Sequence, residues 1–308
     1  MMRHVLLALS MRPAIGRWME RVPATRRLVR RFVAGASAED ALAVLEGLNA
    51  RGLMGAVTYL GENVARPADA ERATQTYLHL LDEIKRRNLN VLPSLKLTHL
   101  GLDLGQPVCV ANLSLVLERA RATGTRVWVD MESSVYTDRT LALYARLRPL
   151  NSHLGCVVQA YLRRTPTDLE RLIDVGATVR LCKGAYREPP AIAYPDKRDV
   201  DRAYRRLIDR LLAPDALARG VYTGFATHDD RMLAHVRDRV RERRLAGGRF
   251  EIQMLYGIRP ELPTRLTGDG LPVRVLVSFG EDWYGYFMRR LAERPANVLF
   301  FFKNLARS

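Results

Sequence analysis

The feature that most constrains the fold of this 308-residue chain is a regular alternation of short apolar runs with longer amphipathic segments. The runs lack the alternating polar residues of a half-exposed strand, which is typical of strands buried on both faces. They predict strands at residues 52–60, 90–97, 126–131, 155–162, 178–182, 221–226, 250–255 and 273–279. Helices are expected after them, at residues 67–87, 108–123, 138–147, 167–174, 200–212, 231–245, 260–266 and 284–293.

Eight such units predict a parallel sheet whose strands are joined by crossover helices. Their combined length of about 240 residues fits a closed (β/α)8 barrel of the TIM type. The alternative is an open doubly wound sheet, which usually has a G-x-G-x-x-G turn after its first strand. Residues 61–64 read Gly-Glu-Asn-Val instead, so the barrel is favoured. We expect an N-terminal helical arm at residues 1–50, with a helix capped by Ser37, and a catalytic barrel domain at residues 51–308.

The charge balance indicates anionic partners. The chain has 49 Lys and Arg against 33 Asp and Glu, a net charge of +16, and the basic excess is densest in the arm. Anionic membranes and nucleic acids both attract such surfaces. No stretch combines basic and aromatic residues as a base-stacking platform does, and no recognition motif is present, so nucleic acid is not an expected partner.

Several features favour a cytoplasmic protein. No apolar run approaches the roughly 20 residues that span a bilayer. The short apolar run at residues 5–11 is followed by a basic amphipathic stretch rather than a clear signal-peptide cleavage site. Cys109, Cys156 and Cys182 are odd in number and lack metal-ligand spacing, so reduced thiols and no zinc site are expected. The basic arm predicts peripheral contact with the anionic inner face of a membrane.

The last predicted helix has a charged face. Tyr286, Arg289, Arg290 and Glu293 fall at offsets of 0, 3, 4 and 7, which share one side of a helix. Two adjacent guanidiniums make a fork that suits a small carboxylate. The competing interpretation is an exposed surface helix with an Arg–Glu pair.

Polar residues also end most of the predicted strands. In a (β/α)8 barrel, chemistry gathers at the carboxyl ends of the strands. The candidates there are Lys96, Asp130, Glu132, Gln159, Arg180, Lys183, Tyr186, Thr227, His228, Gln253 and Tyr256. Many cations without an evident nucleophile suggest an anionic substrate and a phosphate-bearing cofactor that carries the chemistry. The alternative is a Schiff-base lysine, Lys96 or Lys183, as in a barrel aldolase.

An ordered set of segments resembles the proline dehydrogenase family, of the bacterial monofunctional, FAD-dependent type. The segments are RLCKGAY at residues 180–186, FATH at 225–228, FEIQMLYG at 250–257 and YFMRRLAE at 286–293. LKLT at residues 95–98 and DME at 130–132 fit as well. No single segment is decisive, but they occur in the family's order across residues 50–300, so the set is specific.

The resemblance implies a distorted (β/α)8 barrel with non-covalent FAD that oxidises L-proline to Δ1-pyrroline-5-carboxylate. It implies hydride transfer to flavin N5, a quinone as electron acceptor, and a Δ1-pyrroline-5-carboxylate dehydrogenase as a candidate partner. By resemblance, the substrate site comprises Lys96, Asp130, Tyr186, Leu276, Tyr286, Arg289, Arg290 and Glu293. The cofactor site comprises Met131, Gln159, Arg180, Lys183, Gly184, Ala185, Thr227, His228 and Gln253. Another flavin oxidoreductase on a small anion stays open as an alternative.

The resemblance also assigns individual roles. Arg289 and Arg290 would grip the proline carboxylate with help from Lys96, while Glu293 and Asp130 would hold those cations. Arg180 is our candidate for stabilising the reduced flavin.

One position departs from the family pattern. The family usually has tyrosine two residues after the arginine of the eighth strand, and this chain has Leu276 there. Ser278 and Phe279 likewise replace the common proline and tyrosine. Our hypothesis is that Leu276 relaxes discrimination among proline-like rings.

Overall fold

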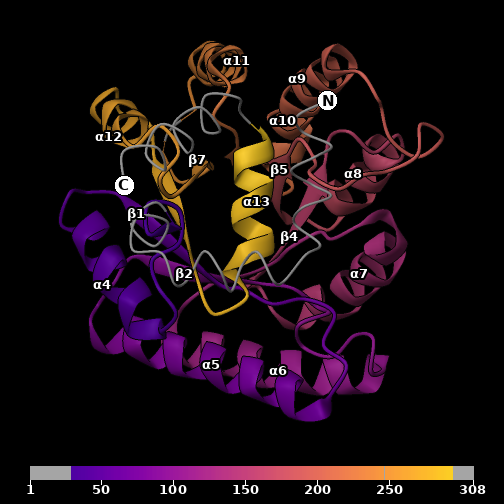
Figure 1. Cartoon of the computed structure of the whole chain (residues 1–308). Coiled ribbons are helices and arrows are strands. Elements are labelled where there is room, and N and C mark those ends of the chain that lie inside the picture. The colour runs from indigo at the N-terminus through magenta and orange to yellow at the C-terminus, as the bar shows by residue number, and fades with distance from the viewer. Residues whose placement is uncertain (1–28, 246, 294–308) are drawn as a thin grey trace.

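The structure, a computed structural model, describes residues 29–245 and 247–293. Within that part, eight parallel strands form one closed barrel in sequence order (Figure 1). They are β1 (Met54–Tyr59), β2 (Val91–Leu95), β3 (Val127–Val129), β4 (Leu154–Gln159), β5 (Thr178–Cys182), β6 (Tyr222–Ala226), β7 (Phe250–Leu255) and β8 (Val273–Phe279). The predicted (β/α)8 barrel is confirmed, and the bounds of β5, β7 and β8 agree with the prediction. The open doubly wound sheet is excluded because β1 pairs with β8.

Helices follow the strands as the apolar periodicity predicts. They are α4 (Ala38–Asn49), α5 (Pro67–Arg86), α6 (Gln106–Thr123), α7 (Ser134–Leu147), α8 (Thr165–Asp174), α9 (Lys197–Leu211), α10 (Pro214–Ala218), α11 (Asp230–Glu242), α12 (Glu261–Gly268) and α13 (Trp283–Glu293). The sequence analysis missed α10 and the 3-10 turn η1 (Arg148–Leu150). Both are too short to give a hydrophobic period.

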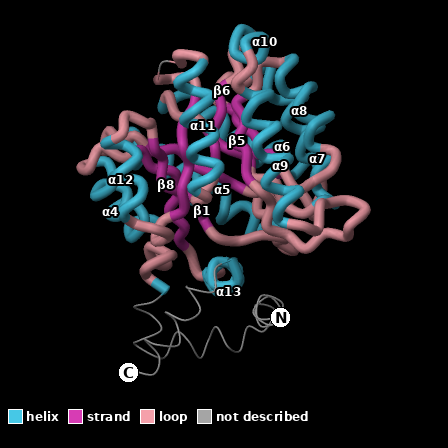
Figure 2. The backbone as a smooth tube through the Cα atoms, turned by 90° about the horizontal axis from the view of Figure 1, so that it is seen from above, coloured by secondary structure: helices cyan, strands magenta, loops and turns pink. Residues whose placement is uncertain are grey.

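The last helix does not take the place that a regular barrel would give it. Helix α4 packs against the outside of β1 and β8, where the helix following β8 would otherwise lie. The predicted cap is confirmed, since the Ser37 hydroxyl accepts from the Asp40 amide and the Asp40 carboxylate accepts from the Ser37 amide. Helix α13 instead crosses the carboxyl end of the barrel (Figures 1 and 2). The division into an arm and a barrel at residue 50 stays a prediction.

A small hydrophobic cluster holds α13 over the barrel. Phe287 is fully buried and lies 5.9 Å, between ring centroids, from both Phe32 and Trp283. Leu60 and Ile258 at the barrel rim belong to the same cluster. Burial of several aromatic rings contributes a few kcal/mol in total. The segment before α4 and the last described helix therefore form a common roof over the strands.

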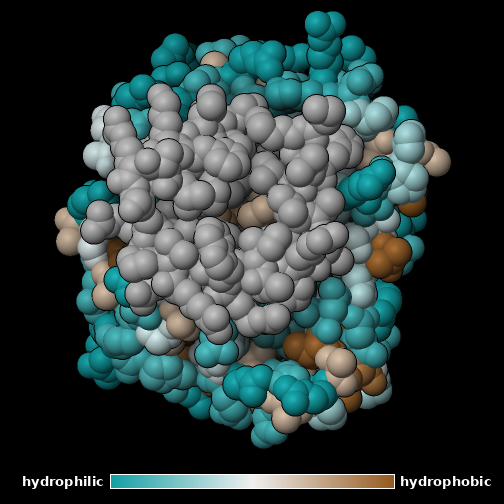
Figure 3. Space-filling view, viewed as in Figure 1, coloured by the Kyte–Doolittle hydropathy of each residue, from teal (hydrophilic) through white to brown (hydrophobic). Residues whose placement is uncertain are grey.

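The barrel interior is unusually polar for a packed core. Arg180, Glu251, Gln253 and Arg274 are all buried on inward positions of β5, β7 and β8. Outside the barrel, a large aliphatic core joins the strands to the helices. The described surface around the roof is mostly hydrophilic, with separate hydrophobic patches (Figure 3). Among the described residues, no helix is long and apolar enough to cross a membrane.

Candidate active site

A cavity of about 440 Å³ lies between the carboxyl ends of the strands and α13, and we call it the carboxyl-end cavity. Its walls include apolar side chains, among them Val157 and Met254. Fifteen of the predicted site residues line it: Lys96, Asp130, Met131, Gln159, Arg180, Lys183, Gly184, Ala185, Tyr186, Thr227, His228, Gln253, Leu276, Tyr286 and Arg290. The structure thus brings together residues that lie up to almost 200 positions apart in sequence.

The predicted clamp is only partly described. Arg290 and Tyr286 line the cavity from α13, and the Arg290 guanidinium carbon lies 5.1 Å from the Tyr286 ring centroid. Arg289 and Glu293 belong to the same helix, but their side chains lie outside the described residues. The roof therefore brings at least one guanidinium to the cavity.

Arg180 is the cation most firmly held in the cavity. Its Nη1 donates to Asp130 at 2.7 Å and to Ser94 at 2.9 Å, while its Nε donates to the Gln253 amide oxygen. The guanidinium carbon lies 4.9 Å from the Trp128 ring centroid. Burial lowers the pKa of Arg180, and the charge of Asp130 opposes that effect. Nη2 is buried and has no hydrogen-bond partner among the described residues, so it can donate to a group in the cavity.

The ion pair of Asp130 with an arginine, one of the two pairings that the residues alone suggested, is confirmed. By resemblance, Asp130 was expected to hold the clamp cations, and an ion pair with Lys96 or an arginine was the interpretation from the residues alone. Asp130 pairs with Arg180, whereas Lys96 pairs with Glu62 at 2.9 Å. The physical reason is reach, since Arg180 is an inward residue of β5 that crosses the barrel to Asp130. Glu62 was not predicted because it lies in the loop after β1, where no periodic pattern distinguishes a functional acid from a solvated one.

Lys183 belongs to a network of charges beside the cavity. Its ammonium donates to Asp201 and, at 2.8 Å, to Asp229. Burial alone would raise the pKa of Asp229, but the hydrogen bond and charge of Lys183, the Arg231 amide and the charge of Lys197 together outweigh it, and the pKa is lowered. Asp229 also caps α11, because its side chain accepts from the Arg231 amide. Two carboxylates accept hydrogen bonds from the ammonium and favour its charged form, which argues against Lys183 as a Schiff-base nucleophile.

Backbone contacts fix the remaining loop residues. His228 Nε2 accepts from the Leu255 amide at 2.9 Å, so the ring is held by β7. Gly184 has a φ of +109°, and a Cβ there would lie 2.1 Å from the Tyr161 ring. Gln159 donates to the Glu132 carbonyl oxygen at 2.8 Å. These contacts shape a rigid wall from the loops after β4, β5 and β6.

His99 is a buried residue that the sequence analysis did not single out. It is 5% exposed, and its ring centroid lies 5.0 Å from that of Tyr59. Burial and the charge of nearby Lys96 lower the pKa of His99 to about 4. The ring is therefore neutral at physiological pH. Its position after LKLT gave no pattern that distinguishes a buried ring from an exposed one.

Comparison with known proteins gives one consistent result. Residues 41–302 match the family described as Proline dehydrogenase. The chain is 39% identical over 305 residues to Proline dehydrogenase 1 of Bacillus subtilis, an alignment that covers 99% of each chain. It is 36% identical over 278 residues to Proline dehydrogenase of Deinococcus radiodurans, covering 89% of this chain and 88% of that protein.

A solved structure shares the fold. Proline utilization A from Bdellovibrio bacteriovorus, inactivated by N-propargylglycine, superposes with a TM-score of 0.79 at 24% sequence identity. The match covers 87% of this chain and 32% of that longer one, so the present chain spans about a third of its length.

Proposed function

Since this chain belongs to the proline dehydrogenase family and is an oxidoreductase acting on the CH–NH group of proline, we propose that it uses FAD held in the carboxyl-end cavity. It catalyses the first step of proline catabolism. The observation that supports the cofactor is the uncommitted, buried Nη2 of Arg180 in a cavity with apolar walls. A flat heterocycle with acceptor atoms on its edge would satisfy that donor.

The other predicted cofactor residues suit parts of the same molecule. Lys183, Gly184 and Ala185 follow β5, where an ammonium and backbone amides favour a pyrophosphate. Thr227 and His228 at the end of β6 would reach the adenosine part. Met131 and Gln159 would lie along the flavin. The arrangement therefore supports binding of FAD along the ends of β3 to β7.

The substrate side of the proposal rests on α13. Arg290 supplies a guanidinium for the proline carboxylate, and Tyr286 and Leu276 offer surfaces for the ring. Arg289 stays a predicted second guanidinium, and Tyr186 a predicted wall of the same subsite. Lys96 is held by Glu62 and can add a third positive charge near the carboxylate. Such a clamp supports orientation of the substrate, which lowers the entropic part of the barrier.

Hydride transfer from proline does not require a strong base of the protein to remove a proton from carbon. FAD, when bound, would supply the hydride acceptor at N5. The residues of the chain would bind the carboxylate, accept the substrate with a neutral amine, and exclude water beneath α13. The product is Δ1-pyrroline-5-carboxylate, formed when the ring C–N bond becomes an imine.

Removal of Arg180 should test the cofactor assignment. We expect purified protein to contain FAD and Arg180→Met to weaken FAD binding at least ~10-fold, because a charged hydrogen bond contributes about 1.5–3 kcal/mol. Titration of apoprotein with FAD, followed by flavin fluorescence, measures this. Arg163→Met is the matched control, since that arginine is exposed and stacks on Tyr194 outside the cavity. A wild-type protein that binds no FAD would overturn the proposal.

The partners of the reaction are further proposals. We propose that the electrons pass to a quinone and that the product passes to a Δ1-pyrroline-5-carboxylate dehydrogenase. The basic arm would aid contact with an anionic membrane surface where a quinone resides. Residues 1–28 of that arm lie outside the described residues. Equal sedimentation of the full chain and a chain lacking residues 1–28 with anionic vesicles would contradict the contact, and this truncation keeps Phe32 beneath α13.

A further inference from the structure

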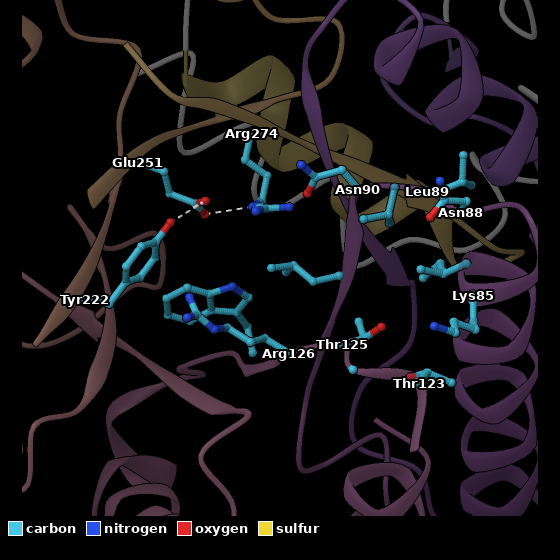
Figure 4. Close-up of a pocket in the computed structure, with 15 residues that line it drawn as sticks. Lys85, Asn88, Leu89, Asn90, Thr123, Thr125, Arg126, Tyr222, Glu251 and Arg274 are labelled. Atoms are coloured by element: carbon cyan, nitrogen blue, oxygen red, sulfur yellow. Dashed lines mark hydrogen bonds and ion pairs between the residues drawn. The ribbon is translucent and has the colours of Figure 1, made fainter. Parts of the chain in front are cut away.

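A continuous line of hydrogen bonds runs through the barrel interior below the carboxyl-end cavity. Arg180 donates to Gln253, Gln253 donates to Glu251 at 2.5 Å, and Arg274 donates to Glu251 at 2.8 Å. We call these four residues the core hydrogen-bond chain. Its lower end borders a second cavity of about 300 Å³ at the amino ends of the strands. Figure 4 shows Glu251 between Tyr222 and Arg274 in that cavity.

Glu251 is the anionic centre of the chain. Its side chain is fully buried, and its two oxygens accept from Arg274 Nε, the Tyr222 hydroxyl and Gln253 Nε2. Burial alone would raise the pKa of Glu251, but the charge of Arg274 and the hydrogen bonds from Arg274, Tyr222 and Gln253 together outweigh it, and the pKa is lowered. The side chain is therefore a carboxylate, which accepts hydrogen bonds and donates none.

That property decides how the Gln253 amide is oriented. An amide can present either its oxygen or its NH2 group to a neighbour. Because Glu251 only accepts, the NH2 group of Gln253 must face it. The amide oxygen must then face Arg180, which only donates. The carboxylate of Glu251 thus fixes an acceptor for Arg180 through one intervening side chain.

The orientation of Arg180 depends on that acceptor. Gln253 binds Nε, while Asp130 and Ser94 bind Nη1. These contacts together set the plane of the guanidinium and leave Nη2 for the cavity. If Glu251 no longer accepted from Gln253, the buried NH2 group of Gln253 would lack a partner, and the Gln253 side chain would move away from Nε to find one. The guanidinium would then rotate away from its position.

We propose that Glu251 is a positioning residue for the cofactor site, which acts through Gln253 to orient Arg180 toward bound FAD. The proposal rests on the proposed FAD function. Glu251 does not line the carboxyl-end cavity, so it would contact neither FAD nor the substrate. Its effect is therefore on FAD affinity and on the relative stability of oxidised and reduced FAD. A well-placed cation favours the reduced, more negative form.

Glu251→Gln should expose this role. The new amide can turn its NH2 group toward Gln253 Nε2, which also donates, so it no longer holds the Gln253 side chain in place. We expect about a tenfold rise in the Kd of apoprotein for oxidised FAD. We also expect a lower midpoint potential of bound FAD, by about 30 mV for each tenfold change in relative affinity of a two-electron couple.

Two further variants separate this effect from loss of folding. Glu251→Gln alone leaves the buried guanidinium of Arg274 without its carboxylate partner. The double variant Glu251→Gln, Arg274→Met removes both charges, and replacement of a whole buried ion pair is often neutral for stability. The double variant should still show weaker FAD binding and a lower potential. Tyr222→Phe is the matched control, because it removes one hydrogen bond to Glu251 and keeps the carboxylate. Its Kd for FAD should stay within twofold of the wild-type value, and its midpoint potential within a few millivolts.

The outcomes distinguish the two proposals. Wild-type protein that binds no FAD overturns the proposed function. If the wild type binds FAD and the folded double variant has the same Kd and midpoint potential, the positioning role alone is overturned. Equal changes in Tyr222→Phe and Glu251→Gln would also overturn it, because the effect would then follow general disturbance of the barrel interior.

Discussion

Leu276 stands where the family pattern has a tyrosine, and the structure gives this side chain a defined place. It is half-buried on β8, lines the carboxyl-end cavity, and packs against an apolar cluster that includes Ala56 and Met131. An aliphatic surface rather than a phenol therefore faces the space above the barrel. Leucine is smaller than tyrosine, so it leaves more room in the cavity for a substituent on a substrate ring.

Introducing the phenol tests what the leucine does. We expect Leu276→Tyr to raise the preference for proline over 4-hydroxyproline about tenfold, because a phenol narrows the ring subsite and contact differences of this kind amount to about 1–3 kcal/mol. The kcat/KM values for the two substrates provide the measurement. An unchanged ratio would refute the hypothesis that Leu276 relaxes ring discrimination.

The neutral ring of His99 gives stability a specific pH dependence. Its pKa is about 4 in the folded protein and about 6.5 when unfolded. Between those values the unfolded state binds more protons, so stability falls as the pH falls from 6.5 toward 4. From pH 6.5 to pH 5 this lowers the free energy of unfolding by about 1.5 kcal/mol. Urea unfolding at the two pH values should show that loss in the wild type and a smaller one in His99→Gln; equal losses would contradict the assignment.

At the scale of elements, the connection from β5 to α9 depends on one glycine. Gly184 combines a φ of +109° with close approach to the Tyr161 ring, and it lines the carboxyl-end cavity. Gly220 has a φ of +87° with open space around the position of a Cβ. The two positions share the conformational strain of an added side chain but differ in the steric clash.

Alanine at each glycine separates the two costs. We expect Gly220→Ala to lower the free energy of unfolding by about 1 kcal/mol from backbone strain. Gly184→Ala should cost more than ~2 kcal/mol and weaken FAD binding, because the loop must move off Tyr161. Chemical denaturation and FAD titration of both variants measure this. Similar losses in the two variants would mean that the contact with Tyr161 has no effect.

The periodicity of the sequence predicted the elements better than their arrangement. Continuous apolar runs gave the strands because each strand is buried on both faces. The placement of α13 over the barrel was not predictable from its own period, since it depends on Phe32 and Trp283 packing around Phe287. The space on the outer wall is taken by α4, which a linear sequence does not show.

At the scale of the whole molecule, barrel topology explains why scattered residues meet. Parallel strands in sequence order put all the carboxyl ends on one side, so most strand-end candidates line one cavity. Glu132 and Tyr256 are the exceptions, and the Glu132 carboxylate accepts from Thr98 instead. Which charges pair there was not predictable, because it depends on side-chain reach across the barrel, as with Arg180 and Asp130. Glu251 was overlooked for a similar reason, since a buried acid inside a strand looks like an ordinary strand residue.

One cavity would hold the flavin beside a clamp for the proline carboxylate. The most direct test is an anaerobic titration of purified protein with L-proline while the flavin absorbance is recorded. We predict bleaching of the oxidised flavin by proline, and loss of bleaching at the same proline concentrations in Arg290→Met with its FAD still bound. A flavin-loaded wild-type protein that proline does not bleach, or a variant that bleaches like the wild type, would contradict the account.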